Sequence, residues 1–432
     1  MMKLVDTRTR EGRRELESLL RSRRGASPDF TALKQILPVV EDVLRRGEPA
    51  LRKYVERFDQ PAHPSKKILI DPRLEKLTRV DETFARAFRL ARRRIEAYHR
   101  RQMASSSSGF SFKDLLGVSF VERSGPLESV GVYVPGGRAF YPSSLLMGVL
   151  PARVAGVPRV VVATPPRAWA ASPELRWAAR ELDIDEVLLA GGAHGIAGLV
   201  SVCGVAKIVG PGNRFVAAAK HLVSGLVAVD MPAGPSEVLI VASGDAEPSL
   251  VAADLLAQAE HDPDATCLLL TDSRHLALAV RVEVEQQIGR FEENASSKVI
   301  RAALSRGGRI FLFKEISLAV EVGSQIAAEH VQVMGRRAER LAPALLPTAG
   351  ALFIGSSTPT AFGDYLAGPN HVLPTGGAAR SFSGLSVRDF LRWGRSTKVP
   401  GSAARMLAPP AADLARFEGL MAHAAALERR AP

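Results

Sequence analysis

Hydrophobic residues follow one period before residue 129 and another after it. Between residues 30 and 46, apolar side chains recur every three or four positions, which predicts an amphipathic helix with a kink or a restart at Pro38 and an end at Gly47. A second helix is predicted to follow. After residue 129, short β-branched runs alternate with alanine-rich stretches. The first of these runs are VGVYV, RVVVAT, EVLLA and KIVGPG.

This alternation of strands and helices is typical of a parallel α/β sheet, and it occurs twice. The two units are predicted to meet at residues 231–235. The second unit contains the runs EVLIVA, TCLLLT and RIFLF. Beyond Arg380 the chain turns to shorter helices and ends in an amphipathic segment, residues 411–430, that is expected to contact a partner.

Composition places the chain among ordinary globular proteins. Of its 432 residues, 46% are hydrophobic and 24% charged, so a core can form and a disordered chain is excluded. The longest apolar region, residues 145–164, is interrupted by prolines and arginines, whereas a membrane helix needs about 20 predominantly apolar residues. No membrane span is predicted, and an N-terminus without an apolar run predicts a cytoplasmic protein.

The net charge of +12 raises the hypothesis of nucleic-acid binding, because the segment ARRRIEAYHRRQ has the density of a phosphate-contacting patch. Its arginines alternate with Ile95, Ala97 and Tyr98, which favours the solvated face of an amphipathic helix. A basic surface also attracts an anionic dinucleotide without any nucleic-acid role.

Glycine-rich loops follow three of the predicted strands, at residues 135–137, 191–192 and 210–212. Each loop alone could simply turn the chain, but the ends of strands in α/β sheets are where ligands bind. Three such loops in one unit favour a nucleotide site. The complete G-x-G-x-x-G motif does not occur, because Phe215 stands where the loop after Lys207 would need its third glycine.

Two groups of polar residues suggest catalytic chemistry. Gln258 and His261 lie three positions apart at the end of a predicted helix, which suits two ligands of one metal, although such a pair is more often a cap or a packing contact. Glu329 and His330 adjoin at a helix–strand junction and could form an acid–base pair, with a solvated Glu beside a buried His as the simpler alternative. Further nitrogen and oxygen ligands follow at Asp364, Asn370, His371 and His423.

Taken together, these segments resemble histidinol dehydrogenase over nearly the whole chain. The most specific of the matching motifs are DMPAGPSEVL, QAEHDPDA and GPNHVLPT, and they occur in the common order of the family. Members of that family are NAD-dependent zinc enzymes that oxidise L-histidinol through the aldehyde to L-histidine, the last step of histidine biosynthesis.

The resemblance implies a role for each matching residue. About one zinc per subunit would be held by Gln258, His261, Asp364 and His423, which also meet the substrate. Glu329 and His330 would be the acid–base pair and contact the substrate, together with Ser236, His371 and Glu418. NAD would be contacted by Tyr133, His194 and Asn213. Family members are homodimers, so His423 and Glu418 would act in the neighbouring subunit's site.

The implied fold consists of two incomplete Rossmann-like domains with parallel sheets plus small helical N- and C-terminal accessory segments. Residues 1–25 would form the N-terminal helical segment. Residues 26–130 and 236–380 would form the first domain, which holds the zinc and acid–base residues. Residues 131–235 would form the second domain, which contacts NAD, and residues 381–432 a dimerisation segment.

The sequence departs from the family at His194, which stands where a glutamine usually contacts NAD. Histidine donates one hydrogen bond when neutral and two when protonated, so this contact is predicted to depend on pH. The following stretch is shorter than usual, which could instead leave His194 as a solvated turn residue. Ala328 replaces a common proline, which is predicted to be neutral.

Two other functions compete with this one. A related zinc and NAD dehydrogenase could oxidise another polar alcohol such as a sulfonated diol, but Glu418 would repel a sulfonate. A non-catalytic, basic nucleic-acid-binding protein would have no use for the complete set of ligand and acid–base residues. The sequence therefore predicts an enzyme with a small-molecule substrate and neither nucleic acid nor membrane as its partner.

Overall fold

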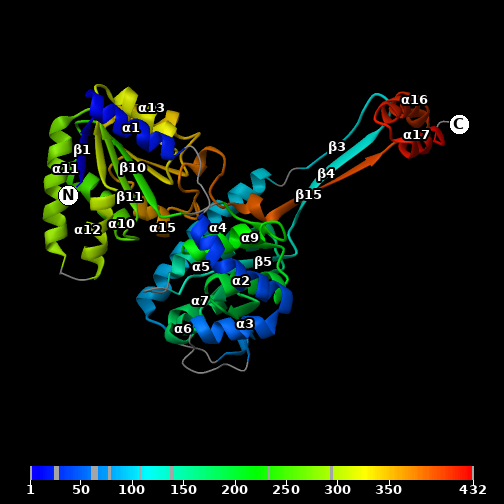
Figure 1. Ribbon diagram of the computed structural model, residues 1–432, viewed down its shortest axis with the longest axis horizontal. Helices are drawn as coiled ribbons and strands as arrows, with labels where there is room; N and C mark the ends of the chain where they lie inside the picture. The colour runs from blue at the N-terminus through cyan, green and yellow to red at the C-terminus, as the bar shows by residue number, and fades with distance from the viewer. Residues whose placement is uncertain are drawn as a thin grey trace.

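Strand pairing divides the chain into two six-stranded sheets and a three-stranded arm (Figure 1). The computed structural model describes residues 2–23, 29–59, 67–75, 79–106, 109–136, 141–231, 234–291 and 295–430. The predicted α/β architecture with parallel sheets is confirmed, since every pairing within the two large sheets is parallel except that of the short edge strand β2.

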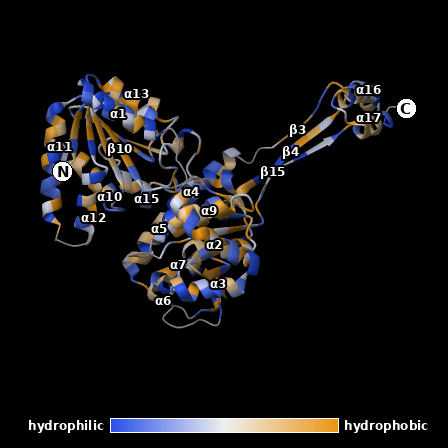
Figure 2. Cartoon of the chain, in the orientation of Figure 1, coloured by the Kyte–Doolittle hydropathy of each residue, from blue (hydrophilic) through white to orange (hydrophobic). Residues whose placement is uncertain are grey.

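The first sheet has the order β1-β12-β11-β10-β13-β14. Its central strands are buried on both faces, which explains their continuous apolar runs, and Figure 2 shows hydrophobic residues concentrated along them. Helices α10, α11 and α12 cover one face, and α1, α13 and α14 the other. The bounds are β1 Lys3–Asp6, α1 Arg10–Ser22, β10 Glu237–Ala242, α10 Pro248–Ala259, β11 Thr266–Thr271, α11 Arg274–Arg290, α12 Ala295–Arg306, β12 Arg309–Leu312, α13 Ile316–Ile326, β13 His330–Met334, α14 Arg336–Leu341, β14 Ala351–Ile354 and, beyond the sheet, α15 Thr360–Tyr365.

The second sheet has the order β2-β7-β6-β5-β8-β9. Helices α4, α5, α6 and α7 pack on one face, and α2, α3, α8 and α9 on the other. The bounds are α2 Phe30–Arg46, α3 Glu48–Tyr54, a π-helical turn Val55–Asp59, β2 Leu69–Ile70, α4 Glu82–Ser106, β5 Ser129–Tyr133, α5 Pro142–Ala155, β6 Arg159–Thr164, α6 Pro166–Ala171, α7 Pro173–Glu181, β7 Glu186–Leu189, α8 Gly192–Ser201, β8 Lys207–Val209, α9 Arg214–Val223 and β9 Ala228–Val229.

The arm is a three-stranded antiparallel ribbon that projects from the second sheet and carries two helices at its far end (Figure 1). These helices bury only small contacts between themselves, around Ala412, Ala415 and Ala424, and leave Leu414 and Phe417 exposed. Such an exposed apolar surface is typical of a protein–protein contact. The bounds are β3 Phe110–Lys113, β4 Ser119–Pro126, β15 Leu391–Lys398, α16 Gly401–Phe417 and α17 Met421–Glu428.

Two of the predicted domain assignments were wrong. Residues 1–25 do not form a separate helical segment, because β1 pairs in parallel with β12 and is an edge strand of the first sheet. Residues 26–130 do not join residues 236–380, because α2 packs against α8 and α9 and shares the core of the second sheet through Ile36 and Val40. The α4 helix covers the other face of that same sheet.

Three predictions of local structure also need correction. The segment beyond Arg380 is not helical throughout, because Leu391–Lys398 form β15 and pair with β4. Helix α2 runs through Pro38 without restarting, and it ends as predicted at Gly47, whose positive φ allows the chain to leave the helix. The C-terminal amphipathic segment is two helices, which Gly419 separates. Over the described ranges, no helix combines the length and hydrophobicity needed to cross a membrane.

Candidate active site

The predicted acid–base pair, Glu329 and His330, sits where β13 begins, beside the start of β10. The Glu329 carboxylate accepts a hydrogen bond from the Glu237 backbone N–H, with 2.7 Å between Oε2 and N. The His330 ring donates from Nδ1 to the Glu237 carbonyl oxygen at 3.3 Å, and Nδ1 lies 3.6 Å from Glu329 Oε2. Both side chains are buried. One residue of β10 therefore orients the acid and the base together.

These contacts assign different roles to the two nitrogens of His330. Because Nδ1 donates to a carbonyl oxygen, the neutral ring carries its lone pair on Nε2. That atom is buried and has no hydrogen-bond partner within the part of the chain that the structure describes. Nε2 is therefore the atom available to accept a proton from a bound molecule.

Charged neighbours change the proton affinity of His330. Burial lowers its pKa, but the Glu329 carboxylate and, further away, Asp364 oppose burial and raise the pKa to about 9. For His371 burial prevails and lowers the pKa, although Asp364 acts in the opposite direction. The neighbouring carboxylates therefore raise the proton affinity of His330, whereas burial lowers that of His371.

This difference can be measured in the metal-free protein. The ring of His330 is expected to lose its proton near pH 9, and Glu329→Gln is expected to lower that pKa because it removes the nearest negative charge. NMR of protein with ¹⁵N-labelled histidine would follow the titration, with His330→Asn to assign the signal. A His330 pKa that Glu329→Gln leaves unchanged would contradict the electrostatic explanation.

Asp364 and His371 join the pair from the segment that follows the first sheet. Asp364 lies on α15, and His371 Nδ1 donates to its backbone oxygen at 3.1 Å, with 3.7 Å to Asp364 Oδ1. The same segment contacts the second sheet, because the Asn370 amide donates to the carbonyl oxygen of Met147 in α5 at 2.7 Å. The amino ends of the first sheet's strands therefore face the second sheet.

Two of the predicted metal ligands lie at the end of α10, which packs against α15. Gln258 is buried, and its Nε2 atom has no hydrogen-bond partner among the described residues. His261 is exposed just beyond the helix. The oxygen of the buried Gln258 amide, the accessible His261 imidazole and the Asp364 carboxylate fit the nitrogen and oxygen donors that zinc takes. Within the described residues of one chain, no group of three His, Cys, Asp or Glu side chains is placed to hold a metal.

The remaining predicted residues lie in two different places. Ser236 precedes Glu237, next to the acid–base pair, and its backbone oxygen pairs with Thr266. Glu418 and His423 are exposed at the far end of the arm, away from the other site residues of the same chain (Figure 1). A single chain therefore does not bring all the predicted site residues together.

The predicted cofactor residues gather at the carboxyl ends of β5, β7 and β8. The Tyr133 hydroxyl accepts the Gly192 N–H at 2.9 Å, and burial is the main reason why the pKa of Tyr133 is raised to about 12. Asn213 caps α9 by accepting from the backbone N–H groups of Phe215 and Val216. These contacts shape two of the three glycine loops.

His194 occupies the first turn of α8 and is only 4% exposed, so it is not a solvated turn residue. Its Nε2 atom donates to Asp59 Oδ2 at 2.9 Å, and the same carboxylate oxygen accepts the Gly191 N–H at 2.9 Å. Asp59 ends the π-helical turn after α3 and was not among the predicted site residues. Asp59 is the last residue of RGEPALRKYVERFD, a further stretch of the sequence that resembles the family, and this position could have marked it as a site residue.

Glu237 is a second residue that sequence reasoning missed. Its buried carboxylate pairs with Arg23 at 2.5 Å and accepts the Gly376 N–H. Burial raises the pKa of Glu237, and the Arg23 guanidinium opposes that shift. The side chain thus ties the start of β10 to the N-terminal segment, while its backbone holds the acid–base pair.

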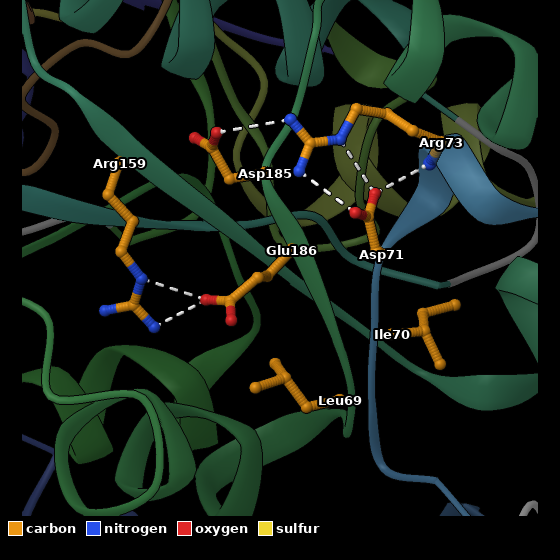
Figure 3. A pocket seen from close by; sticks show the side chains of 7 residues that line it. All are labelled: Leu69, Ile70, Asp71, Arg73, Arg159, Asp185 and Glu186. Atoms are coloured by element: carbon orange, nitrogen blue, oxygen red, sulfur yellow. Dashed lines mark hydrogen bonds and ion pairs between the residues drawn. The ribbon is translucent and has the colours of Figure 1, made fainter.

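A surface hollow of about 430 Å³ lies elsewhere, at the amino ends of β6 and β7 (Figure 3). Its charges are already paired: Arg159 binds Glu186 at 2.5 Å, and Arg73 binds Asp71 at 2.9 Å. It is therefore separate from both the acid–base pair and the glycine loops.

Comparisons with known proteins identify the family at the level of both sequence and fold. A sequence profile of the family described as histidinol dehydrogenase matches residues 22–431. The chain is 40% identical to a histidinol dehydrogenase of Agrobacterium fabrum and 41% identical to one of Bradyrhizobium diazoefficiens, and each alignment covers 96% of this chain and 95% of the relative. The crystal structure of histidinol dehydrogenase from Elizabethkingia anophelis superposes with a TM-score of 0.85 at 29% identity, covering 99% of this chain and 98% of that one.

The resemblance inferred from the sequence motifs is thereby confirmed. Because the match extends over nearly the whole length and over the fold itself, this chain belongs to the histidinol dehydrogenase family.

Proposed function

We propose that this chain oxidises L-histidinol through L-histidinal to L-histidine and reduces two NAD to NADH. The observation that carries the proposal is the buried Glu329–His330 pair, which the Glu237 backbone orients, with an unpartnered Nε2 atom beside Asp364 and His371. The family membership supports an NAD-dependent oxidoreductase with this substrate.

The substrate would lie between the first sheet and the cofactor loops of the second. Zinc, when bound by Gln258, His261, Asp364 and His423, would supply a positive centre that holds the amine and imidazole nitrogens of the substrate. Ser236 and His371 are close enough to the acid–base pair to line the same site. Glu418 would accept an imidazole N–H of the substrate.

The first oxidation needs a base. In its neutral form, the His330 ring would accept the hydroxyl proton on Nε2 while the carbon-bound hydrogen leaves as hydride to NAD, which gives the aldehyde and NADH. The buried setting keeps water from competing for that proton. Asp364 and Glu329 stabilise the imidazolium that results, since both raise the proton affinity of His330.

The second oxidation needs a water molecule. Glu329 Oε2 is held by the Glu237 N–H, which leaves Oε1 to take a proton from water as it adds to the aldehyde carbon. The resulting hydrate loses a second hydride to a second NAD and becomes the carboxylic acid. Two NADH and one L-histidine would form from each L-histidinol.

The complete site would require two copies of the chain. Glu418 and His423 lie on the exposed helices of the arm, far from the acid–base pair of their own chain (Figure 1). The uncovered apolar residues of α16 and α17 suit a contact with a second subunit, which would bring both side chains to its site. We therefore infer a homodimer with shared active sites.

The basic segment of α4 has a structural use that differs from nucleic-acid binding. Arg89 pairs with Glu181 at 3.1 Å, Arg100 pairs with Glu96 at 2.6 Å, and Arg94 binds the carbonyl oxygen of Leu366. Arg89 and Arg94 thus join α4 to α7 and to the residues after α15, whereas Arg100 pairs within α4 itself.

The proposed function has a direct test that includes metal removal. The purified protein is expected to form two NADH per L-histidinol consumed, to contain about one zinc per subunit, to lose turnover on chelation and to regain it with zinc. NADH absorbance, histidine analysis and elemental analysis would measure these quantities. Full activity without metal would contradict the zinc role. Preference for a sulfonated diol over L-histidinol would contradict the substrate.

A further inference from the structure

The loop after β8 is built around a glycine that no other residue can replace. Gly210 has a φ of +118°, and a Cβ atom on it would lie 2.3 Å from the Tyr133 carbonyl oxygen. The loop therefore presses directly on the end of β5. It continues through Gly212 to Asn213, which caps α9.

Both backbone polar groups of Gly210 are held by charged side chains. The N–H donates to Asp230 Oδ2 at 2.8 Å, and Lys220 Nζ donates to the carbonyl oxygen at 3.0 Å. Lys220 lies on α9 and Asp230 directly after β9, and the two side chains also form an ion pair with each other. The lysine side chain is 9% exposed and the aspartate 1%.

A buried ion pair is a costly way to stabilise a fold. Removing both charges from water costs free energy that their attraction only partly returns, and apolar side chains of similar size often stabilise a protein as well or better. The pair instead fixes the orientation of the Gly210 backbone, because the aspartate can bind only its N–H and the lysine only its carbonyl oxygen. Since each charge neutralises the other, neither is left to attract the phosphates of a dinucleotide.

We propose that Lys220 and Asp230 are positioning residues that hold the loop 210–213 in the conformation that receives NAD. A movement of Gly210 would displace Asn213 on one side and Tyr133 on the other, and Tyr133 in turn holds the Gly192 N–H. Two of the three predicted cofactor contacts thus depend on this pair. The role rests on the proposed NAD-linked function.

The test removes both charges at once, because loss of one would leave the other buried and unpaired. The double variant Lys220→Met/Asp230→Leu keeps the side-chain volumes but lacks both holds on Gly210. Its dissociation constant for NADH, measured by the fluorescence of NADH without turnover, is expected to rise by about tenfold to a hundredfold. Zinc content and the KM for L-histidinol are expected to stay within about twofold of the parent, because the proposed zinc and substrate residues lie at the first sheet and on the arm rather than on the loop 210–213.

A second double variant removes only one of the two contacts to Gly210, and it can replace the first variant if that one does not fold. Lys220→Met/Asp230→Asn keeps an oxygen acceptor for the Gly210 N–H and loses only the hold on the carbonyl, so its NADH dissociation constant is expected to lie between those of the parent and the Met/Leu variant.

The matched control is a similar pair at the opposite end of β8. Lys207 Nζ lies 3.2 Å from Asp389 Oδ1, and the lysine side chain is as buried as that of Lys220. Lys207→Met/Asp389→Asn is expected to bind NADH like the parent. Parent-like NADH binding by both Lys220/Asp230 variants, or an equal loss in the Lys207/Asp389 control, would overturn the positioning role. Failure of the parent itself to bind NADH would overturn the proposed function and this role with it.

Discussion

Replacement of His330 by alanine is expected to lower kcat for L-histidinol oxidation by about 10²–10⁴-fold, the usual cost of losing a general base. The reason is geometric: Nε2 is the nitrogen left free when Nδ1 binds the Glu237 carbonyl oxygen, and the part of the chain that the structure describes offers it no other partner. Steady-state kinetics with L-histidinol would measure the loss. His330→Ala is expected to slow both oxidations, because each releases a proton from an oxygen bound to the reacting carbon.

Glu329→Gln is expected to divide the two half-reactions. Only the aldehyde step needs an activated water molecule, so turnover of L-histidinal should fall more than the formation of the aldehyde from L-histidinol. Supplying L-histidinal directly and comparing single-turnover NADH formation for each step separates the two. Equal slowing of both steps by Glu329→Gln would argue against this division.

A buried histidine outside the site gives the matched control for His330. His99 is fully buried in α4, where its Nδ1 atom lies 2.8 Å from Gln102 Oε1. His99→Ala is expected to lower thermal stability through lost packing while kcat stays near that of the parent. A comparable loss of kcat in His99→Ala would mean that burial, rather than proton transfer, explains the His330→Ala result.

The second large effect concerns the sharing of sites between subunits. His261→Ala and His423→Ala are each expected to abolish turnover through loss of zinc, yet purified heterodimers of the two are expected to regain about half of the parent activity. In such a heterodimer the His423→Ala subunit keeps an intact His261 and receives His423 from its partner, so one of the two sites is complete. Co-expression with two different tags would isolate these heterodimers for assay.

The control for this heterodimer experiment uses two zinc ligands, Gln258 and His261, that the same subunit supplies to one site. A heterodimer of Gln258→Ala and His261→Ala subunits is expected to stay inactive, because each site then lacks one ligand from α10 or the residues just after it. Zinc content should follow activity in every combination. Inactive heterodimers of His261→Ala and His423→Ala, verified by their tags, would show that His423 serves its own chain.

Local patterns determined many of the elements. The run EVLIVA became β10 with all six residues buried, and the stretch before Gly47 became α2, because strand and helix periods are set by neighbours along the chain. The motifs also sufficed to recognise the family. Local patterns do not determine which sheet a helix covers. The apolar face of α2 would suit either sheet, and the prediction placed this helix on the first sheet, whereas it packs on the second.

For the site, too, the sequence predicted the residues but not their arrangement in space. From the sequence it was possible to name Glu329 and His330 as a pair, but strand ends were expected to bind ligands at their carboxyl side, and this pair lies at the amino ends of β10 and β13. The glycine loops of the second sheet do lie at the carboxyl ends of their strands. The packing of residues 366–371 against α4 and α5 helps to bring the two edges to face each other.

The sequence by itself therefore determined the main strands of the two large sheets, the family and the chemical identity of the site residues, because short motifs and the periods of neighbouring side chains specify them. The tertiary structure decided the partners of those residues: Asp59 for His194, Glu237 for the acid–base pair, and Asp230 with Lys220 for Gly210. Several of these contacts join segments separated by about ninety residues or more, and loop closure places no mark on the local sequence pattern at either end.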